Sequence, residues 1–269
     1  MRTLSGLKLC FVAGTLGNGG AERQLFYILQ ALCREGATPQ LFAMDSGEFW
    51  EKRIKNLGVS VTCVGERGSR LARLLRLVKE IRNCRPDVLQ SQHFYTNAYV
   101  ALTAWFFGLS GIGAMRNNGS SEVTDTGGIG GRLSLHLPRT IAANSQVAIR
   151  YAIDCGVPAS RLFFLPNVVD TEWFKPTTAP VEEPLTLVAV GRLVKQKRLD
   201  RFISILHRLR TDLRLNVKGL IVGNGRQDEL QNHARQFGLL PDGVQFLGSV
   251  SDMRSVYQQA AVCVLSSDH

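Results

Sequence analysis

Short apolar runs alternate with helix-like segments along almost the whole chain of 269 residues, and this rhythm constrains the fold more than any other feature. Neighbouring parallel strands need a crossover connection, usually a helix, so the alternation is typical of an α/β protein whose sheet is covered on both faces. In the first part of the chain, strands are expected at residues 7–13, 39–43, 59–64, 88–91, 112–115, 140–143 and 162–165.

The rhythm stops at "PNVVDTEWFKPTTAPVEEP", a proline-rich stretch without periodicity that predicts a linker. It then restarts, with strands expected at 185–190, 215–222, 244–247 and 262–265, and helices at 196–210, 228–237 and 253–260. We therefore expect two Rossmann-like, doubly wound parallel-sheet domains, residues 1–176 and 177–269. The second is expected to be incomplete, because such sheets usually have about five or six strands.

Basic residues outnumber acidic ones, 32 to 22, which gives a formal net charge of +10. Such a charge favours anionic partners, among them nucleotides, phosphosugars and anionic membranes. Nucleic acid is not expected, because the chain has no interleaved aromatic and basic residues and no known nucleic-acid motif. The six cysteines form no CxxC pair, which indicates a reducing, cytoplasmic compartment without disulfides or a zinc site.

The longest uncharged stretch, residues 98–115, contains "YVALTAWFFGLSGIGAM". A membrane-spanning helix needs about 20 predominantly apolar residues, and glycines interrupt the second half of this stretch. We therefore predict a buried helix, a glycine turn and a strand. The apolar run near the N-terminus is predicted to be the first strand and not a signal peptide, because a glycine loop follows it.

A glycine turn, "GTLGNGGAERQ", follows that first strand. Glycines let backbone amides approach a ligand, and a helix N-terminus attracts anions, so Gly19 and Gly20 are candidate phosphate-binding residues. The dinucleotide fingerprint GxGxxG is broken, because Glu22 stands where its third glycine belongs. An ordinary turn between strand and helix is the alternative.

Arg192 and Lys197 flank a second loop, which begins at Gly191 where a strand is expected to end. Both side chains are expected to face the crevice above the strand ends, where open parallel sheets bind ligands. Arg offers phosphate a rigid fork and Lys a compact charge. Solvated surface charges are the alternative, but cations oppose the dipole at a helix N-terminus, and a bound anion would remove that conflict.

Two weaker candidates also lie at strand ends. His93 follows the fourth expected strand, where an imidazole suits a hydrogen-bonding or proton-transfer role, although a lone histidine is more often structural. Gly223 and Gly225, in "VGNG", would allow a base or ribose to approach, or would simply form a turn.

The segment "RGSRLARLLRLVKEIRNCR" predicts a basic amphipathic helix. Its apolar stripe is expected to comprise Leu71, Leu74, Leu75, Leu77, Val78 and Ile81. The remaining surface carries Arg70, Arg73, Arg76, Lys79 and Arg82. Such a helix can lie on an anionic membrane. The alternative is a stripe packed on the sheet with a solvated basic face, and both can hold at once.

Seven short motifs occur in the order found in one family, and the third and fourth are the most specific: "GGAERQ", "NS" at Asn144–Ser145, "PNVVDTEWF", "GRLVKQKRLD", "VGNG", "VQFLG" and "VLSS". The set resembles the retaining glycosyltransferases of the fourth sequence family, and the resemblance covers essentially the whole chain. It implies a GT-B fold, with two Rossmann-like domains that face each other across a cleft. It also implies transfer of a hexosyl group, with retention, from a UDP- or GDP-linked sugar to a polysaccharide or lipid-linked acceptor in cell-envelope glycan synthesis, including lipopolysaccharide. The site of action would be the cytoplasm, including the inner face of the plasma membrane.

The resemblance also implies roles for single residues. Arg192 and Lys197 would bind the donor diphosphate and stabilise the departing nucleotide in place of a metal ion, so no metal or other cofactor is expected. Gly19 and Gly20 would turn backbone amides toward the reaction centre, and His93 would lie near the donor sugar. The nucleotide would be lined by Gly191, Gly223 and Gly225.

The chain departs from the family pattern at Val168 and Arg198, where glycines are common, and Arg198 is expected to add charge beside the phosphate site. Two glutamates that the family places after the "SS" loop would fall beyond His269, so the resemblance implies an N-terminal portion of a longer enzyme. A sugar-nucleotide epimerase and a non-catalytic binding module are the alternatives. A dehydrogenase is least expected, because the glycine fingerprint is broken.

Overall fold

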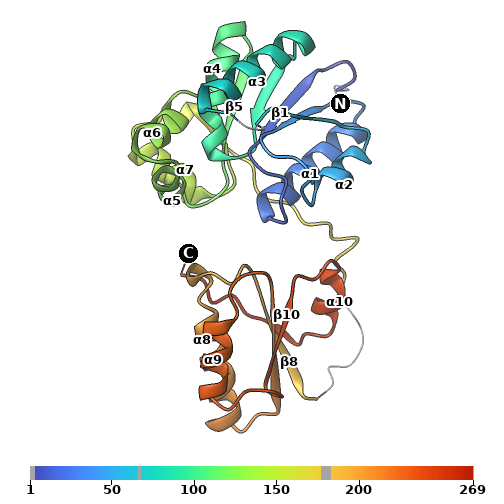
Figure 1. Ribbon diagram of the computed structural model, residues 1–269, viewed down its shortest axis with the longest axis vertical. Helices are drawn as coiled ribbons and strands as arrows, with labels where there is room; N and C mark the ends of the chain where they lie inside the picture. Colours follow the sequence, from blue (N-terminus) through green and yellow to red (C-terminus); the bar gives the residue numbers. More distant parts are fainter. Residues whose placement is uncertain (1–3, 66–67, 177–182, 269) are drawn as a thin grey trace. The chain divides into compact units, whose positions relative to one another are not determined.

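The computed structural model describes residues 4–65, 68–176 and 183–268. Its contacts divide the chain into two units, Met1–Val168 and Val169–His269, called unit 1 and unit 2 below (Figure 1). The domain boundary was predicted between residues 176 and 177. It lies at the start of segment 177–182, which is outside the described residues.

Unit 1 is built on a sheet of seven strands in the order β3-β2-β1-β4-β5-β6-β7. Every neighbouring pair in it is parallel. The strands are β1 Leu9–Ala13, β2 Gln40–Ala43, β3 Ser60–Cys63, β4 Val88–Ser91, β5 Ser110–Met115, β6 Thr140–Ala143 and β7 Leu162–Phe164. All seven were predicted, with ends that differ by a few residues at most.

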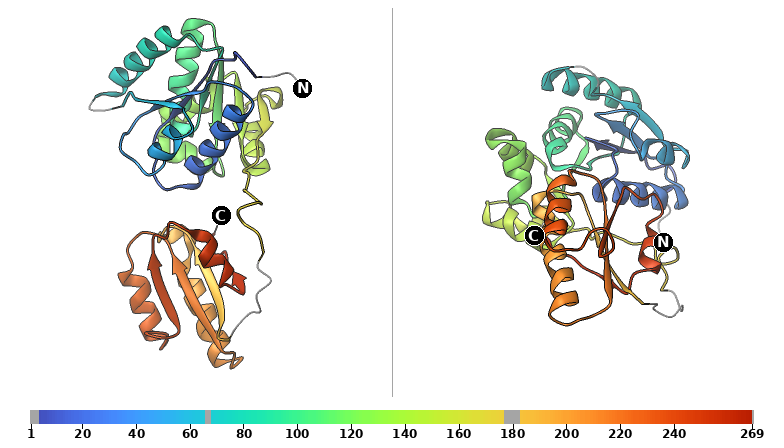
Figure 2. Two further views of the ribbon diagram at one scale, coloured as in Figure 1. Left: turned by 90° about the vertical axis from the view of Figure 1, so that its right-hand side faces the viewer. Right: turned by 60° about the horizontal axis from the view of Figure 1, so that its bottom comes forward.

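Helices cover both faces of this sheet (Figures 1 and 2). They are α1 Gly20–Arg34, α2 Glu51–Lys55, α3 Arg70–Cys84, α4 Asn97–Phe107, α5 Ser120–Thr126, α6 Gly128–His136 and α7 Gln146–Asp154, with short 3-10 turns η1 Phe94–Thr96 and η2 Ala159–Arg161. Leu25 and Leu29 of α1 pack on Phe11 on one face. Leu77 and Ile81 of α3 pack with Val12 on the other.

Unit 2 has a four-stranded parallel sheet in the order β10-β9-β8-β11. Its elements are β8 Leu185–Val190, η3 Lys195–Lys197, α8 Leu199–Thr211, β9 Val217–Val222, α9 Asp228–Gln236, β10 Val244–Gly248, α10 Met253–Gln258 and β11 Val262–Cys263. Helices α8 and α9 share a core with one face of the sheet, and α10 packs on the other face. The α/β class and the two Rossmann-like parallel sheets are therefore confirmed.

Three local predictions need correction. The helix expected from residue 196 begins instead at Leu199, because Arg198 has a φ of 46° and separates it from the turn η3. The apolar stripe of α3 is only partly inward, since Leu71 and Leu75 are exposed. The helix, turn and strand predicted over 98–115 are confirmed as α4, Gly108 and β5, but α4 leaves the side chains at its C-terminal end exposed.

No helix in the described ranges combines the length and the apolar character that crossing a bilayer requires.

Candidate functional site

The topology collects the predicted site residues into two sets, one in each unit. Open parallel sheets bind ligands at the carboxyl ends of their strands, where the strand order reverses. In unit 1 that point lies between β1 and β4, which are followed by the glycine turn and by His93. In unit 2 it lies between β8 and β11, and Arg192 and Lys197 follow β8.

His93 lies just past β4 and is held through both ring nitrogens. Its Nδ1 accepts a hydrogen bond from the backbone N–H of Gly14 at 3.1 Å, so the proton of the neutral ring is on Nε2. Nε2 donates to Oε1 of Glu22 at 3.0 Å. The two side chains are 11% and 8% exposed, so the pair is largely withdrawn from water. The imidazole therefore ties the end of β4 to both the loop after β1 and the helix α1.

Glu22 is a residue that sequence reasoning missed, because it appeared only as the break in a glycine fingerprint. It lies in the first turn of α1, where a negative charge complements the helix dipole. A Cβ on Gly19 would collide with this carboxylate, so a side chain at Gly19 would have to displace it. At Gly20 no described atom lies within 4 Å of the corresponding point. The Glu22 carboxylate therefore occupies part of the space at the N-terminus of α1 where a phosphate was predicted to bind. The space beside Gly20 stays open.

A second carboxylate fixes the loop after β1. Glu48, from the loop after β2, accepts hydrogen bonds from Oγ1 of Thr15 at 2.6 Å and from the backbone N–H of Leu16. Oγ1 of Thr15 accepts in turn from the N–H of Gly17 at 3.1 Å. The conformation of this loop is therefore set by a side chain distant in sequence.

Tyr95 stands beside His93, with the two rings stacked at a centroid distance of 5.5 Å. Partial burial and the carboxylates of Glu22, Asp45 and Glu48 raise the pKa of Tyr95 to about 12. Its hydroxyl therefore stays protonated at neutral pH and can donate a hydrogen bond.

A buried polar cluster continues along the same sheet edge. Gln92 donates to the carbonyl of Ala21 at 2.6 Å, and Arg116 donates to Oε1 of Gln92 at 3.4 Å. Glu122 accepts from the backbone N–H of Arg116 at 2.9 Å, yet burial raises the pKa of Glu122 to about 7. Three buried atoms in this cluster have no hydrogen-bond partner among the described residues: Nε of Arg116, Oε2 of Glu122 and Oδ1 of Asn144.

The motif residues Asn144 and Ser145 organise the start of α7 in this region. Ser145 accepts a hydrogen bond from the N–H of Ala148 at 3.1 Å and so caps the helix. Asn144 donates to the carbonyl of Arg116 at 2.9 Å. The "NS" motif therefore has a structural function at the end of β6.

In unit 2, the aliphatic stem of Lys197 packs over Gly191 at the end of β8. A Cβ on Gly191 would lie 3.4 Å from Cγ and Cδ of Lys197, which is close contact. The carbonyl of Lys197 accepts a hydrogen bond from Oγ of Ser266, in the loop after β11, at 2.9 Å. Arg192 follows Gly191 directly and is exposed. Both cations therefore stand at the strand end where a donor was predicted to bind.

Arg198 differs from these two cations, because its charge is balanced inside unit 2. Its guanidinium lies 2.9 Å from a carboxylate oxygen of Asp200 and 3.2 Å from one of Asp268. Its positive φ lies in the left-handed region, which gives a physical reason for the glycine common at this position in the resembled family. Arg198 was expected to add charge beside the phosphate site, and the carboxylates of Asp200 and Asp268 offset that charge.

Gly223 and Gly225 have a clear packing reason to be glycine. Both have a φ of +146°, and a Cβ on Gly223 would collide with the carbonyl of Gly191. A Cβ on Gly225 would lie 2.7 Å from the carbonyl oxygen of Leu193, to which the segment is bridged. These glycines bring the loops after β8 and β9 together, and their contact with a nucleoside stays a prediction.

The departure at Val168 is also explained. Gln24 of α1 donates to the carbonyl of Val168 and accepts from its N–H, both at 2.8 Å. Only backbone atoms of Val168 take part in these two hydrogen bonds, so they are compatible with any side chain at this position. Gln24 belongs to the same "GGAERQ" motif as Glu22 and was not singled out from the sequence.

The cysteines are free thiols, and the Sγ atoms of Cys10 and Cys84 lie 3.6 Å apart. Burial raises the pKa of Cys10, which makes this thiol unreactive at neutral pH. Among the residues that the structure describes, no group of three or more His, Cys, Asp or Glu side chains could hold a metal ion.

Comparison with known proteins identifies both parts of the chain. A family model described as Glycosyltransferase Family 4 matches residues 18–173, and one described as Glycosyl transferases group 1 matches residues 184–269.

Two curated relatives give sequence matches. An N-acetylgalactosaminyltransferase of Campylobacter jejuni, which extends a GalNAc-containing glycan on diNAcBac-PP-undecaprenol, is 25% identical over 97% of this chain and 73% of the relative. One of the subunits of the phosphatidylinositol N-acetylglucosaminyltransferase of Arabidopsis thaliana is 31% identical over 42% of this chain. That second match spans only 26% of the plant protein.

Solved structures show the same fold. Anabaena HepE in complex with UDP-glucose has a TM-score of 0.81 at 18% identity, over 97% of this chain and 74% of that one. TarM has a TM-score of 0.78 at 10% identity, over 99% of this chain and 81% of that one.

Proposed function

The chain belongs to glycosyltransferase family 4, and we propose that it transfers a hexosyl group from a nucleotide sugar to a glycan or lipid-linked acceptor. It is a glycosyltransferase with the GT-B fold, and the donor, acceptor and stereochemistry are the new parts of the proposal. A UDP-linked donor is favoured because the HepE structures contain UDP or UDP-glucose. A lipid-linked acceptor is favoured because the Campylobacter relative acts on one.

The observation that carries the proposal is the pair of cations at the end of β8. Arg192 is exposed, the Lys197 stem lies over Gly191, and neither joins an ion pair within the described part of unit 2. A diphosphate above the strand end would receive a bidentate arginine contact and a point charge. The same two groups would stabilise negative charge on the leaving UDP as the glycosidic bond breaks.

In this proposal the acceptor hydroxyl attacks the anomeric carbon from the face that UDP leaves and passes its proton to the departing phosphate oxygen, so the anomeric configuration is retained. No divalent cation is needed, because the two side chains neutralise the diphosphate.

UDP binding tests the central step without requiring turnover. By isothermal titration calorimetry, Arg192→Ala and Lys197→Ala should each weaken UDP binding about ten- to a hundredfold, from the loss of hydrogen bonds to charge worth about 1.5–3 kcal/mol. Arg208→Ala removes the same charge from the exposed far end of α8 and should change binding less than about twofold. EDTA should leave the affinity unchanged. The assigned role would be refuted if both site variants bound UDP and GDP as tightly as the wild-type protein does.

A transfer assay separates the alternatives. Wild-type protein supplied with UDP-sugars and a lipid diphosphate oligosaccharide should release UDP only when acceptor is present, and NMR should show the donor's anomeric configuration in the product. Conversion of UDP-sugar without acceptor would favour an epimerase. UDP binding with neither reaction would favour a binding module.

A further inference from the structure

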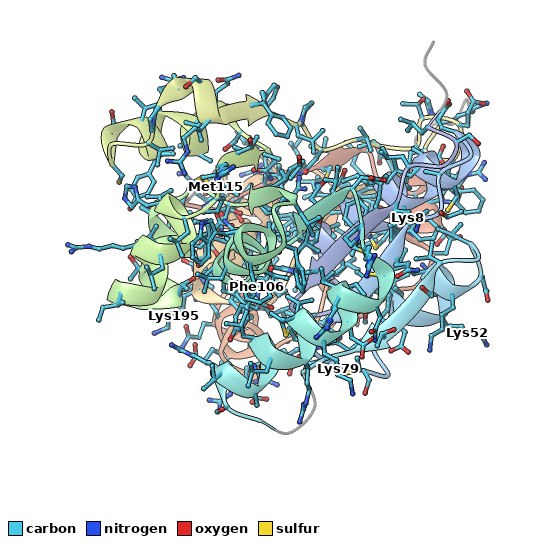
Figure 3. The ribbon with its side chains drawn as sticks, turned by 90° about the horizontal axis from the view of Figure 1, so that it is seen from above. Lys8, Lys52, Lys79, Phe106, Met115 and Lys195 are labelled. Carbon is cyan, nitrogen blue, oxygen red and sulfur yellow. The ribbon has the colours of Figure 1, made fainter. Side chains whose placement is uncertain are left out.

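The loop after β11 is attached to the turn that carries Lys197. Oγ of Ser266 donates a hydrogen bond to the carbonyl of Lys197 at 2.9 Å. The backbone N–H of Asp268 donates to the carbonyl of Gln196 at 3.2 Å. Both acceptors belong to η3, the short turn that begins at Lys195 (Figure 3). The loops that follow β8 and β11 are therefore joined through backbone atoms of η3.

Two arginines at the start of α8 hold the same loop. The guanidinium of Arg201 lies 2.8 Å from Oδ1 of Asp268, and that of Arg198 lies 3.2 Å from the same oxygen. Arg201 also donates to the carbonyl of Ser266 at 3.5 Å. Asp268 therefore bridges the N-cap and the first turn of α8. We call Arg198, Arg201 and Asp268 the ion triad.

The backbone of Arg198 supports a function for its side chain. Its φ of 46° is in the left-handed region, which glycine adopts without strain. Glycine would have no side chain to reach Asp268. Strained residues persist where the surrounding structure holds them, and they cluster at functional sites. We therefore looked for a role of the ion triad in the binding of the donor.

The ion triad is too exposed to matter much for the stability of unit 2. The side chains of Arg198, Arg201 and Asp268 are 31%, 47% and 39% exposed, and exposed ion pairs add little to the free energy of unfolding. Such contacts can still favour one arrangement of a loop before a ligand binds. Holding that arrangement in advance lowers the entropic cost of binding.

We propose that Asp268, held by Arg198 and Arg201, is a positioning residue for the donor diphosphate. It keeps η3 and the loop after β11 in one arrangement, so that Lys197 is already in place when the diphosphate arrives. Asp268 itself does not contact the donor. The inference rests on the proposed function for the role of Lys197, and it assigns a part in donor binding to three residues outside the pair Arg192 and Lys197.

The sign of the effect separates positioning from simple charge. Asp268 places a negative charge beside η3, where the negative diphosphate is proposed to bind. If only electrostatic attraction mattered, Asp268→Asn would remove a repulsion and strengthen UDP binding. Positioning predicts the opposite change, a UDP affinity about three- to tenfold weaker, because the released loop must be ordered again on binding.

Isothermal titration calorimetry with UDP tests this on the whole chain. Asp268→Asn and Arg201→Ala should each weaken UDP binding about three- to tenfold. The double variant should lose no more than Asp268→Asn alone, because both changes release the same loop. Arg201→Lys keeps a cation opposite Asp268 and should bind UDP more tightly than Arg201→Ala.

Uridine shows whether the loss belongs to the diphosphate. Uridine has no phosphate for Lys197 to hold, and ligand-observed NMR can measure its weak binding. Uridine should bind wild type and the triad variants equally. A general loosening of unit 2 would weaken the binding of uridine and UDP together, so this measurement separates positioning of Lys197 from damage to the fold.

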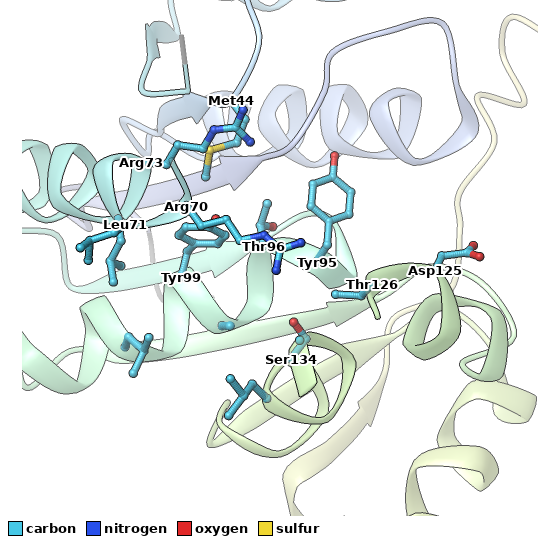
Figure 4. Close-up of a pocket in the computed structure, with 15 residues that line it drawn as sticks. Met44, Arg70, Leu71, Arg73, Tyr95, Thr96, Tyr99, Asp125, Thr126 and Ser134 are labelled. Atoms are coloured by element: carbon cyan, nitrogen blue, oxygen red, sulfur yellow. The ribbon is translucent and has the colours of Figure 1, made fainter. Parts of the chain in front are cut away.

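Three control variants match the changes in charge. Arg208 and Asp212 form an ion pair of 3.2 Å at the other end of α8, so Arg208→Ala and Asp212→Asn repeat the changes outside the ion triad. Arg70→Ala removes one cation from unit 1, beside a hollow of about 540 Å³ (Figure 4). Each control should change UDP binding less than about twofold.

Arg198→Gly keeps the test decisive if Asp268→Asn does not fold. It removes one arm of the ion triad, and glycine accepts the positive φ. It should weaken the binding of UDP and leave that of uridine unchanged. A cooperative thermal transition in each variant shows that the protein is folded.

Three results would overturn the inference. The first is UDP binding that is unchanged or tighter in Asp268→Asn. The second is a double variant whose loss is the sum of the two single losses. The third is a parallel loss of uridine binding in the triad variants. Failure of the proposed function looks different, because UDP binding would then be insensitive to Lys197→Ala as well.

Discussion

Both nitrogens of His93 are engaged inside unit 1, and this limits the chemistry that the residue can perform. Because Nδ1 accepts from Gly14 and Nε2 donates to Glu22, the neutral ring offers no unused lone pair. We expect His93 to position the loop after β1 and the Glu22 carboxylate more than to act as a proton acceptor itself. The sequence placed His93 at the right strand end, but its partners come from distant loops and could not be predicted.

Glu122 makes stability depend on pH in a defined window. Its folded-state pKa of about 7 lies above the ordinary value of 4.5, so the unfolded chain loses the proton first as pH rises. The contribution of Glu122 to the free energy of unfolding therefore falls between about pH 4.5 and pH 7 and is flat above that window.

Glu122→Gln removes the ionisation and can keep the hydrogen bond from Arg116. We predict that the variant matches wild type near pH 4 and is more stable at pH 8, by about 1–3 kcal/mol. Urea unfolding at a series of pH values measures this difference. A difference that does not change with pH would contradict the raised pKa.

The left-handed backbone of Arg198 gives a second prediction at this scale. Arg198→Gly and Arg198→Ala lose the same ion pairs with Asp200 and Asp268, but only glycine accepts the positive φ without strain. The glycine variant should therefore unfold at a higher urea concentration than the alanine variant. Equal midpoints would mean that the loop relaxes out of this conformation.

Helix α3 shows how one apolar stripe can be divided between two environments. Leu77 and Ile81 are fully covered by the sheet, whereas Leu71 and Leu75 face outward. Periodicity predicts the stripe but not where the sheet beneath it ends, so the sequence could not reveal this division.

The division predicts unequal losses of stability. Leu77→Ala should lower the free energy of unfolding by about 2–5 kcal/mol, because it leaves a cavity in the core. Leu75→Ala should lower it by less than about 0.5 kcal/mol, because the side chain is already in water. Denaturant unfolding of the two variants tests the placement of α3, and similar losses would contradict it.

Strands were predicted better than helix starts, for a physical reason. Strands of a parallel sheet are covered on both faces and appear as nearly continuous apolar runs, such as Leu185–Val190. The start of α8 depends on a single backbone angle at Arg198, for which arginine gives no sequence signal. The same limit applies to Glu22 and Arg116, whose partners are set by the topology of the sheet.

At the scale of the whole molecule, each unit has an apolar core of its own. Phe11, Leu25 and Leu41 belong to the core of unit 1, and Phe202 and Leu206 to that of unit 2. A ligand that binds one unit stabilises that unit directly by mass action.

UDP should therefore act selectively in calorimetric unfolding. At a UDP concentration about one hundred times its Kd, unit 2 should gain about 2.7 kcal/mol, and the transition of that unit should move to higher temperature. The transition of unit 1 should keep its midpoint. Arg192→Ala should abolish the shift, and a ligand effect on unit 1 alone would contradict the placement of the donor site.

The two hydrogen bonds between Gln24 and Val168 matter for how mutations in this protein are interpreted. They attach Val168, the last residue of unit 1, to α1, the helix whose first turn carries Glu22. A genetic screen scored only by product formation would group Gln24 with the catalytic residues, although its hydrogen bonds are made to the backbone of the chain itself. Deep mutational maps of this enzyme would then overstate the size of the active site. A parallel screen for UDP binding would separate residues that position the backbone from residues that bind the donor.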